Sequence, residues 1–455
     1  MEARSSGAAN RHRLMLLALG IVAIALVVDV VHIDWRVGVD FHTYFAAAEV
    51  GLNEGWSHIY DQEVVGLEQK ELVPTQWSQP FLSPPPVAWL TALFSPLPYK
   101  VALAVWAFIL FIALAFAFAW AGIGRGLGRW IAVFGALSTW WVMLAVDVGQ
   151  IVPVVAAGTV VGWRLLRDKR DIAAGLVLAT ILLKPNTAIL VPLALLLAGR
   201  RRAVAAWLGA AAVVLMAAEL TVSPSGISSY TAELLGPLPT GADSLTLHGA
   251  LGAHGTFALL LRALIIAAVL ATSYRFRRSP AATVPIAILG SMLIAPYLHA
   301  ADLCLLSAAG WMVWEERTSL PWRIPIAVAW VLACPFLYLA GLSLPLYRWP
   351  LLELALLLAL VIAAWWPLTA WADSRRRAPA RRMRSSICTS RRCVRASPVG
   401  TRSSCSLSPP ARRARSRAAS MSGCMTTTAR PGSRRSTAFA PASFVTTPLT
   451  ASDSS

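Results

Sequence analysis

Charged side chains are scarce along this chain, and their scarcity excludes an ordinary soluble domain. Only 14% of the 455 residues are charged and 57% are hydrophobic, whereas about a quarter of the residues of a soluble domain are charged. Long apolar runs occupy 14–31, 101–121 and 351–370. Each run is close to the ~20 residues with which a helix crosses a bilayer. The composition therefore predicts an all-α, polytopic membrane protein.

Cysteine is sparse as well, and its positions exclude familiar metal sites. Of the six cysteines, Cys304 and Cys334 lie in apolar runs and the others lie close to the C-terminus. Their spacing resembles neither a zinc site nor a disulfide framework. The sequence also lacks a glycine-rich phosphate loop and an Asp-x-Asp motif. We therefore predict no metal and no cofactor.

Acidic residues are almost missing from the last part of the chain, which carries most of the net charge of +18. Residues 374–455 contain 17 arginines and one acid, Asp453, whereas the first 373 residues contain 23 basic and 21 acidic side chains. The basicity is thus no argument for a nucleic-acid partner. This composition cannot pack a core. Two interpretations stay open: a disordered basic tail on the anionic inner leaflet, or an out-of-frame translation that replaces the true C-terminus.

The distribution of arginine predicts the topology. Basic residues that flank membrane spans tend to stay in the cytoplasm. If every basic cluster lies inside, residues 1–13 are cytoplasmic, and a membrane domain covers 14–373 with outer loops at 33–83 and 222–254. We expect 10 to 12 transmembrane or re-entrant helices in a multi-pass protein of the bacterial plasma membrane. The proline-broken segment 84–98 is too short to cross and is expected to be re-entrant or interfacial.

The first outer loop contains the densest group of polar side chains beside a membrane span. The stretch VDFHTYFAAAEVGLNEGWSHIYD at 39–61 includes Asp40, His42 and Tyr44. Carboxylates and histidines at a hydrocarbon boundary are costly to keep ordered, which favours a functional role. A carboxylate there could act as a general base. An ordinary solvated loop is the alternative.

Lys184 is the most informative single residue, because it interrupts an apolar run and is followed by Pro185. Proline lacks a backbone donor and disfavours helix at the preceding residue, so a helix break is expected here. An ammonium beside free backbone N–H groups suits a phosphate. The alternative is a lysine that extends to the membrane interface.

Further polar residues fall on the same predicted side of the membrane, although they are distant in sequence. His299 and Asp302 are three residues apart and are expected on one helical face, where they could bind a phosphate or sugar hydroxyls, pair with each other, or form an interfacial pair. Asp147 and Gln150 form a polar turn between apolar runs; a role in the site and a simple turn explain them about equally well. The candidate site residues are Asp40, His42, Tyr44, Asp147, Gln150, Lys184, Asn186, Tyr297, His299 and Asp302.

Four of these segments resemble glycosyltransferase family 87, membrane mannosyltransferases that use a polyprenyl-phosphate sugar donor. They are the stretch at 39–61, QPFLSPPPVAWLTALFSPLPYKVALAVW at 79–106, LLKPNTAILVPLALLLAGRRR at 182–202 and APYLHAADLCLL at 295–306. The resemblance extends over about residues 10–370 and implies a GT-C fold with its active site at the outer face. No nucleotide site is expected.

Carried over residue by residue, the resemblance implies an inverting transfer with Asp40 as the base. Lys184 and His299 would bind the donor phosphate, and the other candidate residues would bind substrate. The partners would be a polyprenyl-phosphate hexose donor, a cell-envelope glycolipid or polysaccharide acceptor, and membrane lipids, without nucleic acid. A transporter or lipid flippase is the alternative, but it would favour internal repeats and polar residues at the midplane. A non-catalytic assembly subunit is a third option.

Overall fold

The computed structural model describes residues 2–31, 38–236, 245–277, 279–316 and 320–365. Within these ranges every regular element is a helix and no strand occurs, which confirms the predicted all-α class. They belong to one compact unit, Met1–Pro379. The predicted basic tail, 374–455, lies outside the described residues.

Six helical segments of the described chain are long and apolar enough to cross a membrane, which confirms a polytopic fold. A seventh crossing is available if α6 (Leu127–Leu137) and α7 (Trp140–Asp147), which meet at 55°, form one broken span. The six segments are Asn10–Val31 in α1 (Glu2–Val31), α5 (Tyr99–Ala121), α11 (Arg201–Leu235), α13 (Gly255–Arg275), Trp322–Leu339 and Leu346–Trp365.

Shorter helices account for the rest of the predicted membrane domain. They are α4 (Pro85–Thr91), α8 (Val152–Arg167), α9 (Asp171–Leu178), α10 (Leu190–Leu197), α12 (Leu247–Ala250), α14 (Thr283–Ile294) and α15 (Cys304–Glu316). The last two spanning segments correspond to α16 (Leu320–Leu332) with α17 (Pro335–Leu339) and to α18 (Trp349–Trp365). The expected 10 to 12 passages counted such short and broken helices, whereas length and composition alone support six or seven spans.

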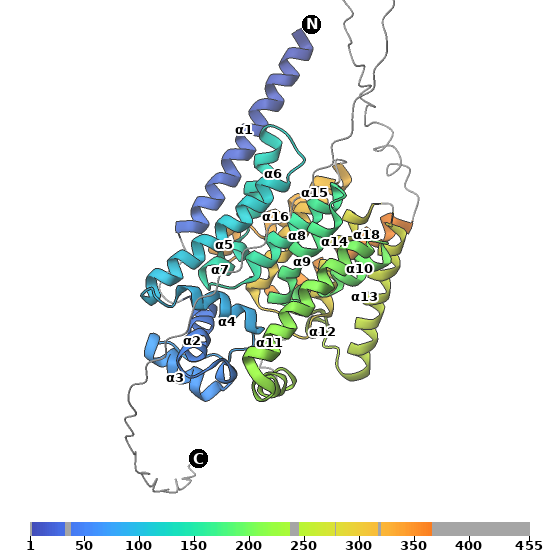
Figure 1. The fold of residues 1–455 in the computed structure, drawn as a ribbon. Coiled ribbons are helices and arrows are strands. Elements are labelled where there is room, and N and C mark those ends of the chain that lie inside the picture. Colours follow the sequence, from blue (N-terminus) through green and yellow to red (C-terminus); the bar gives the residue numbers. More distant parts are fainter. Residues whose placement is uncertain (1, 32–37, 237–244, 278, 317–319, 366–455) are drawn as a thin grey trace, which may run out of the picture. The chain divides into compact units, whose positions relative to one another are not determined.

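Most of the predicted first outer loop is helical. It contains α2 (Val39–Asn53), a 3₁₀ turn at Trp56–His58, and α3 (Gln62–Leu72). These elements pack against each other, and α2 also contacts α4 (Figure 1). Residues 41–48 are all buried, so this part of α2 belongs to the core rather than to a solvated loop. Residues 32–37 lie outside the described ranges.

The second predicted outer loop begins inside α11 rather than after it. Ser223 has φ 64°, and Pro224 follows it, so the helix kinks where the proline removes a backbone donor. The part of α11 beyond the kink carries Tyr230 and ends at Leu235. Of the remaining predicted loop, residues 237–244 lie outside the described ranges.

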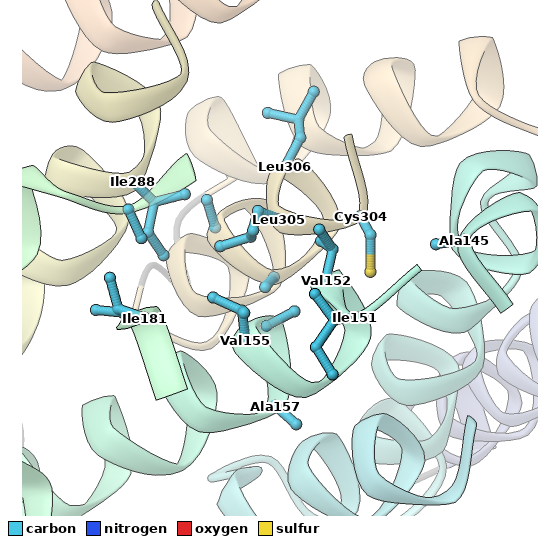
Figure 2. Close-up of a cluster of buried hydrophobic side chains, with 14 of the residues drawn as sticks. Ala145, Ile151, Val152, Val155, Ala157, Ile181, Ile288, Cys304, Leu305 and Leu306 are labelled. Atoms are coloured by element: carbon cyan, nitrogen blue, oxygen red, sulfur yellow. The ribbon is translucent and has the colours of Figure 1, made fainter. Parts of the chain in front are cut away.

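A buried apolar cluster joins α7, α8 and α15. Figure 2 shows Ala145 of α7, Ile151 and Val152 around α8, and Cys304 of α15 gathered in one region. Cys304 and Val152 are fully buried. Close packing of this kind resists small displacements. The cluster therefore fixes the turn between α7 and α8 relative to the start of α15, and both of these carry polar candidate residues.

Candidate functional site

The N-terminus of α2 is docked onto the turn between α7 and α8. The backbone N–H groups of Asp40 and Phe41 both donate to the carbonyl of Val148, at 2.8 and 3.1 Å. The next residue, Gly149, has φ 70°, and a Cβ there would lie 2.5 Å from Cβ of Phe41. Trp106 donates from Nε1 to the Gly149 carbonyl at 2.8 Å. The close approach thus requires glycine, and it places Asp40 beside residues 147–150.

Gln150 holds the carboxylate of Asp40 in one orientation. Its Nε2 donates to Oδ2 of Asp40 at 2.9 Å. Its own Oε1 accepts hydrogen bonds from the Tyr44 hydroxyl and from the backbone N–H of Ile151. Because Gln150 is only 2% exposed and uses both ends of its amide, the amide has little freedom to rotate. In the described part of the chain, Oδ1 of Asp40 has no hydrogen-bond partner, which leaves that oxygen for a ligand.

Burial and four neighbouring groups shift the pKa of Asp40. Burial raises the pKa of this carboxyl and the negative charge of Asp302 adds to the rise, whereas the positive charges of Lys184 and His299 and the Gln150 hydrogen bond lower it. The net pKa is raised above its ordinary value of 3.8. A carboxyl with a raised pKa is a stronger base than an exposed one and is suited to accept a proton.

The helix break predicted at Lys184 is present. Lys184 has φ −152° and ψ 77° and separates two 3₁₀ turns, Ala179–Leu183 and Pro185–Thr187. Its Nζ lies 2.5 Å from Oδ1 of Asp302, whose side chain is completely buried. The lysine side chain itself is 10% exposed. The lysine is therefore half of a buried ion pair and does not extend into solvent.

Of the alternatives for His299 and Asp302, the structure gives the Asp302 carboxylate other partners than the His299 imidazole. His299 precedes the 3₁₀ turn Ala300–Leu303, and Oδ2 of Asp302 accepts the backbone N–H of His299 at 2.8 Å. The carboxylate is occupied by this cap and by Lys184, so the two side chains do not share one helical face. The His299 ring instead contacts the ring edge of Tyr297, at a centroid distance of 5.8 Å.

Asn186 joins the 3₁₀ turn after Lys184 to the segment that precedes His299. Its Nδ2 donates to the carbonyl of Tyr297 at 3.4 Å. The positive charge of Lys184 also acts on the Tyr297 hydroxyl, which places that ring near the ion pair. Asp147 is the last residue of α7 and lies in the turn that carries Gln150. The segments that carry the ten candidate residues therefore meet around Asp40 and Lys184, although one of the ten side chains has its contacts elsewhere.

His42 is the exception. Its Nε2 lies 2.8 Å from the carbonyl of Gln69 in α3, and its ring meets the edge of Tyr99. A carbonyl only accepts, so Nε2 carries the proton. Burial lowers the pKa of His42, and the carbonyl contact opposes this only in part. His42 is thus a neutral residue that joins α2 to α3, on a different side of α2 from Asp40.

Two aromatic residues adjoin this region without having been predicted. The rings of Tyr60 and Tyr230 lie 4.5 Å apart, and Tyr230 interacts electrostatically with Tyr297. Tyr60 lies in the stretch at 39–61 that resembles the family, which was a usable signal. Tyr230 gave none, because only the kink at Pro224 turns its part of α11 toward Tyr60. Aromatic faces of this kind can stack on a sugar ring.

The described residues contain no group of three or more His, Cys, Asp or Glu side chains that could hold a metal ion. The polar cluster instead consists of one oriented carboxylate, one ammonium paired with a second carboxylate, an imidazole and several hydroxyl and amide groups. It can bind an anionic group and a hydroxyl side by side, and it can accept a proton.

Comparison with known proteins agrees with this chemistry. No curated protein and no solved structure matches the chain. The profile of glycosyltransferase family 87 matches residues 81–307, from the segment before α4 to the start of α15. The match includes Gln150, Lys184 and Asp302 but begins after Asp40. On this match and the polytopic helical fold, the chain belongs to glycosyltransferase family 87.

Proposed function

We propose that this glycosyltransferase is an inverting enzyme that moves a hexose from a polyprenyl-phosphate donor to a cell-envelope glycolipid or polysaccharide. The proposed hexose is mannose. The observation that carries the proposal is the arrangement of Asp40. Its carboxylate is oriented by Gln150 at 2.9 Å and lies within the electrostatic reach of Lys184. A base for the acceptor and a cation for the donor phosphate are thus neighbours.

The proposed reaction is a single displacement. Oδ1 of Asp40 accepts the proton of an acceptor hydroxyl while that oxygen forms a bond to the anomeric carbon of the donor. The bond between this carbon and the phosphate oxygen breaks, and the electron pair leaves with the lipid phosphate. One displacement inverts the anomeric configuration, and it needs only one carboxylate because a phosphate leaves without a strong acid.

Lys184 is proposed to stabilise the leaving phosphate. An ammonium has three N–H donors, and Nζ of Lys184 forms an ion pair with Oδ1 of Asp302 at 2.5 Å. The ion pair holds the lysine in place, and its N–H donors are proposed to bind phosphate oxygens. Fixed charges in a site that excludes water stabilise a developing anion more strongly than charges in solvent do. The rings of His299 and Tyr297 adjoin this position.

The contacts of the remaining candidate residues suggest different roles for them. Tyr44 acts through Gln150 and is proposed to position Asp40 rather than to touch substrate. Asn186, which contacts the Tyr297 carbonyl, and Asp147, which precedes the turn of Gln150, are proposed to contact donor or acceptor hydroxyls. His42 is better explained by its bond to the Gln69 carbonyl, so we leave it out of the proposed substrate site.

The proposed location is the bacterial plasma membrane with the site facing outward. The distribution of basic residues supports this orientation. If the arginine clusters lie inside, the segments with the candidate residues lie outside. A polyprenyl-phosphate donor fits this side, because it is membrane-bound and requires no nucleotide.

The test is sugar transfer by the full-length protein in membranes supplied with polyprenyl-phosphate [¹⁴C]mannose. Wild type is compared with Asp40→Asn, Asp40→Ala and a matched control, Asp61→Asn, which removes an acid from the start of α3 instead. We expect transfer by wild type and control, and none by the Asp40 variants. Transfer that persists in both Asp40 variants would remove Asp40 from the chemistry. Transfer from another lipid-linked sugar but not from mannose would change the proposed donor.

A further inference from the structure

A large apolar cavity lies among six helices and is separate from the Asp40 cluster. It has a volume of about 790 Å³ and is lined by α1, α6, the start of α7, α15, α16 and α18. None of the ten candidate residues lines it. The helices α1, α16 and α18 belong to segments that can span a membrane, so the solvent next to the cavity is lipid. Its volume lies within the roughly 300–1,000 Å³ of small-molecule sites.

One charged residue faces this apolar space. Glu353 of α18 lines the cavity and is 1% exposed. Neither of its carboxyl oxygens has a hydrogen-bond partner among the described residues. A buried polar group without a partner is costly, and native structures rarely keep one without a reason. A bound molecule with a polar group beside Glu353 would supply the missing partner.

Three other polar side chains of the wall are paired with one another. Thr139 and Ser307 lie 2.8 Å apart through their hydroxyls, and Trp141 donates from Nε1 to the same Ser307 oxygen at 2.6 Å. These groups satisfy one another. Trp311 and Trp349 also line the cavity, and their Nε1 atoms lack a partner among the described residues. The carboxyl of Glu353, one helical turn after Trp349, is the charged member of this unpaired set.

We propose that this cavity binds an acyl chain of an ester- or amide-linked membrane lipid, with Glu353 hydrogen-bonded to the linkage. The apolar wall suits a hydrocarbon chain, and an ester carbonyl or an amide N–H can pair with a carboxyl in one of its two protonation states. A polyprenyl phosphate is disfavoured, because its chain carries no neutral polar group next to the anionic phosphate. This inference does not depend on the proposed transferase reaction.

Gly310 offers a way to fill the cavity without a clash. It lies in the wall, and a Cβ added there would meet no atom within 4 Å. Gly310→Leu thus places a branched side chain where the lipid chain would lie. Gly209 of α11 has equally open surroundings but lies on an exposed helix face. Gly209→Leu is therefore a matched control for the same substitution in a helix.

The experiment is equilibrium lipid binding by the full-length, delipidated protein in detergent, followed by native mass spectrometry. The probes are a dioleoyl phosphatidylethanolamine, its ether-linked analogue and a polyprenyl phosphate. The proteins are wild type, Gly310→Leu, Gly209→Leu, Glu353→Gln and Glu353→Leu, each shown by gel filtration to be folded. We expect the ester lipid to bind wild type and Gly209→Leu alike and to bind Gly310→Leu about tenfold more weakly.

The role of Glu353 is tested by the chemistry of the linkage. Wild type and Glu353→Gln should prefer the ester lipid to its ether analogue, whereas Glu353→Leu should lose this preference. Binding that is equal in Gly310→Leu and wild type would overturn the cavity as the site. A preference that survives in Glu353→Leu would overturn the role of the carboxyl. Polyprenyl phosphate binding that Gly310→Leu weakens, without effect on the ester lipid, would overturn the choice of an acyl chain.

Discussion

Gln150 donates a hydrogen bond to Asp40 at 2.9 Å across 110 positions of sequence. The same amide accepts from Tyr44 and from the Ile151 backbone. The proposed base is thus oriented by Gln150, which lies in the part of the chain that matches the family profile. Asp40 itself precedes that part.

Replacing Gln150 should therefore impair turnover more than donor binding. Gln150→Ala removes a hydrogen bond to a charged group, a loss of about 1.5–3 kcal/mol, so we expect kcat to fall roughly ten- to hundredfold with little change in KM for the donor. Steady-state kinetics with the lipid-linked donor measure both constants.

Gln76→Ala serves as the control for this variant, because it removes an amide from the loop after α3, away from the Asp40 contacts. An increase in KM with unchanged kcat would show that Gln150 binds substrate directly and does not position the base.

The rate of transfer should depend on the ionisation of Asp40. The carboxyl accepts a proton only when ionised, so transfer should decline as pH falls through its pKa, which is raised above 3.8. The positive charge of His299 lowers this pKa. His299→Gln should therefore shift the acid limb of the pH–rate profile to higher pH.

The profile is measured as kcat/KM for wild type and His299→Gln, with His58→Gln as a control for the loss of an imidazole outside the cluster. A limb that moves to lower pH in His299→Gln, or does not move, would contradict the assignment of that limb to Asp40.

Part of this arrangement could be predicted from the sequence. Pro185 within an apolar run was enough to predict the break at Lys184, and the uninterrupted run at 101–121 was enough to predict α5. The partner of Lys184 could not be predicted, because nothing in a short window indicates that Asp302 contacts a residue from another helix. The burial of α2 was also missed, since a polar stretch between apolar runs reads as a loop.

Variants of the Lys184–Asp302 pair should show that its contribution to stability is separate from the contribution of Lys184 to transfer. Lys184→Met leaves a buried carboxylate without its cation, which typically costs about 3–5 kcal/mol. The double variant Lys184→Met/Asp302→Asn removes both charges and keeps an oxygen for the His299 N–H. We expect it to recover most of the stability while transfer stays lost, because no ammonium remains for the phosphate.

Thermal unfolding in detergent and transfer at matched amounts of folded protein measure the two effects. Arg164→Met, which breaks a partly exposed pair with Asp168, is the control and should cost at most about 1 kcal/mol. Recovery of transfer in the double variant would assign Lys184 a structural role alone.

His42 should affect stability rather than chemistry. His42→Leu leaves the buried Gln69 carbonyl without its donor, at a cost of about 1–3 kcal/mol, whereas His42→Gln can retain an Nε2 donor. The pKa of His42 is lowered below 6.5 by burial, so the unfolded chain binds a proton first as the pH falls. Stability should thus decline between pH 6.5 and the lower folded pKa.

Thermal unfolding of wild type, His42→Gln and His42→Leu over this pH range tests the assignment. The decline should be absent in both variants, because neither has an imidazole at this position. A loss of kcat in His42→Gln with unchanged stability would return His42 to the substrate site.

The interruption at Lys184 has a consequence for how the protein is made. The helices on either side, α9 and α10, have eight residues each and are only ~12 Å long, against a hydrocarbon layer of ~30 Å. Neither can insert as an independent segment during synthesis. Each must pack against a partner: α9 contacts α8, which is synthesised before it, and α10 contacts α14, which is synthesised after it. The position of the Lys184 ammonium therefore depends on the order in which these helices are synthesised and packed.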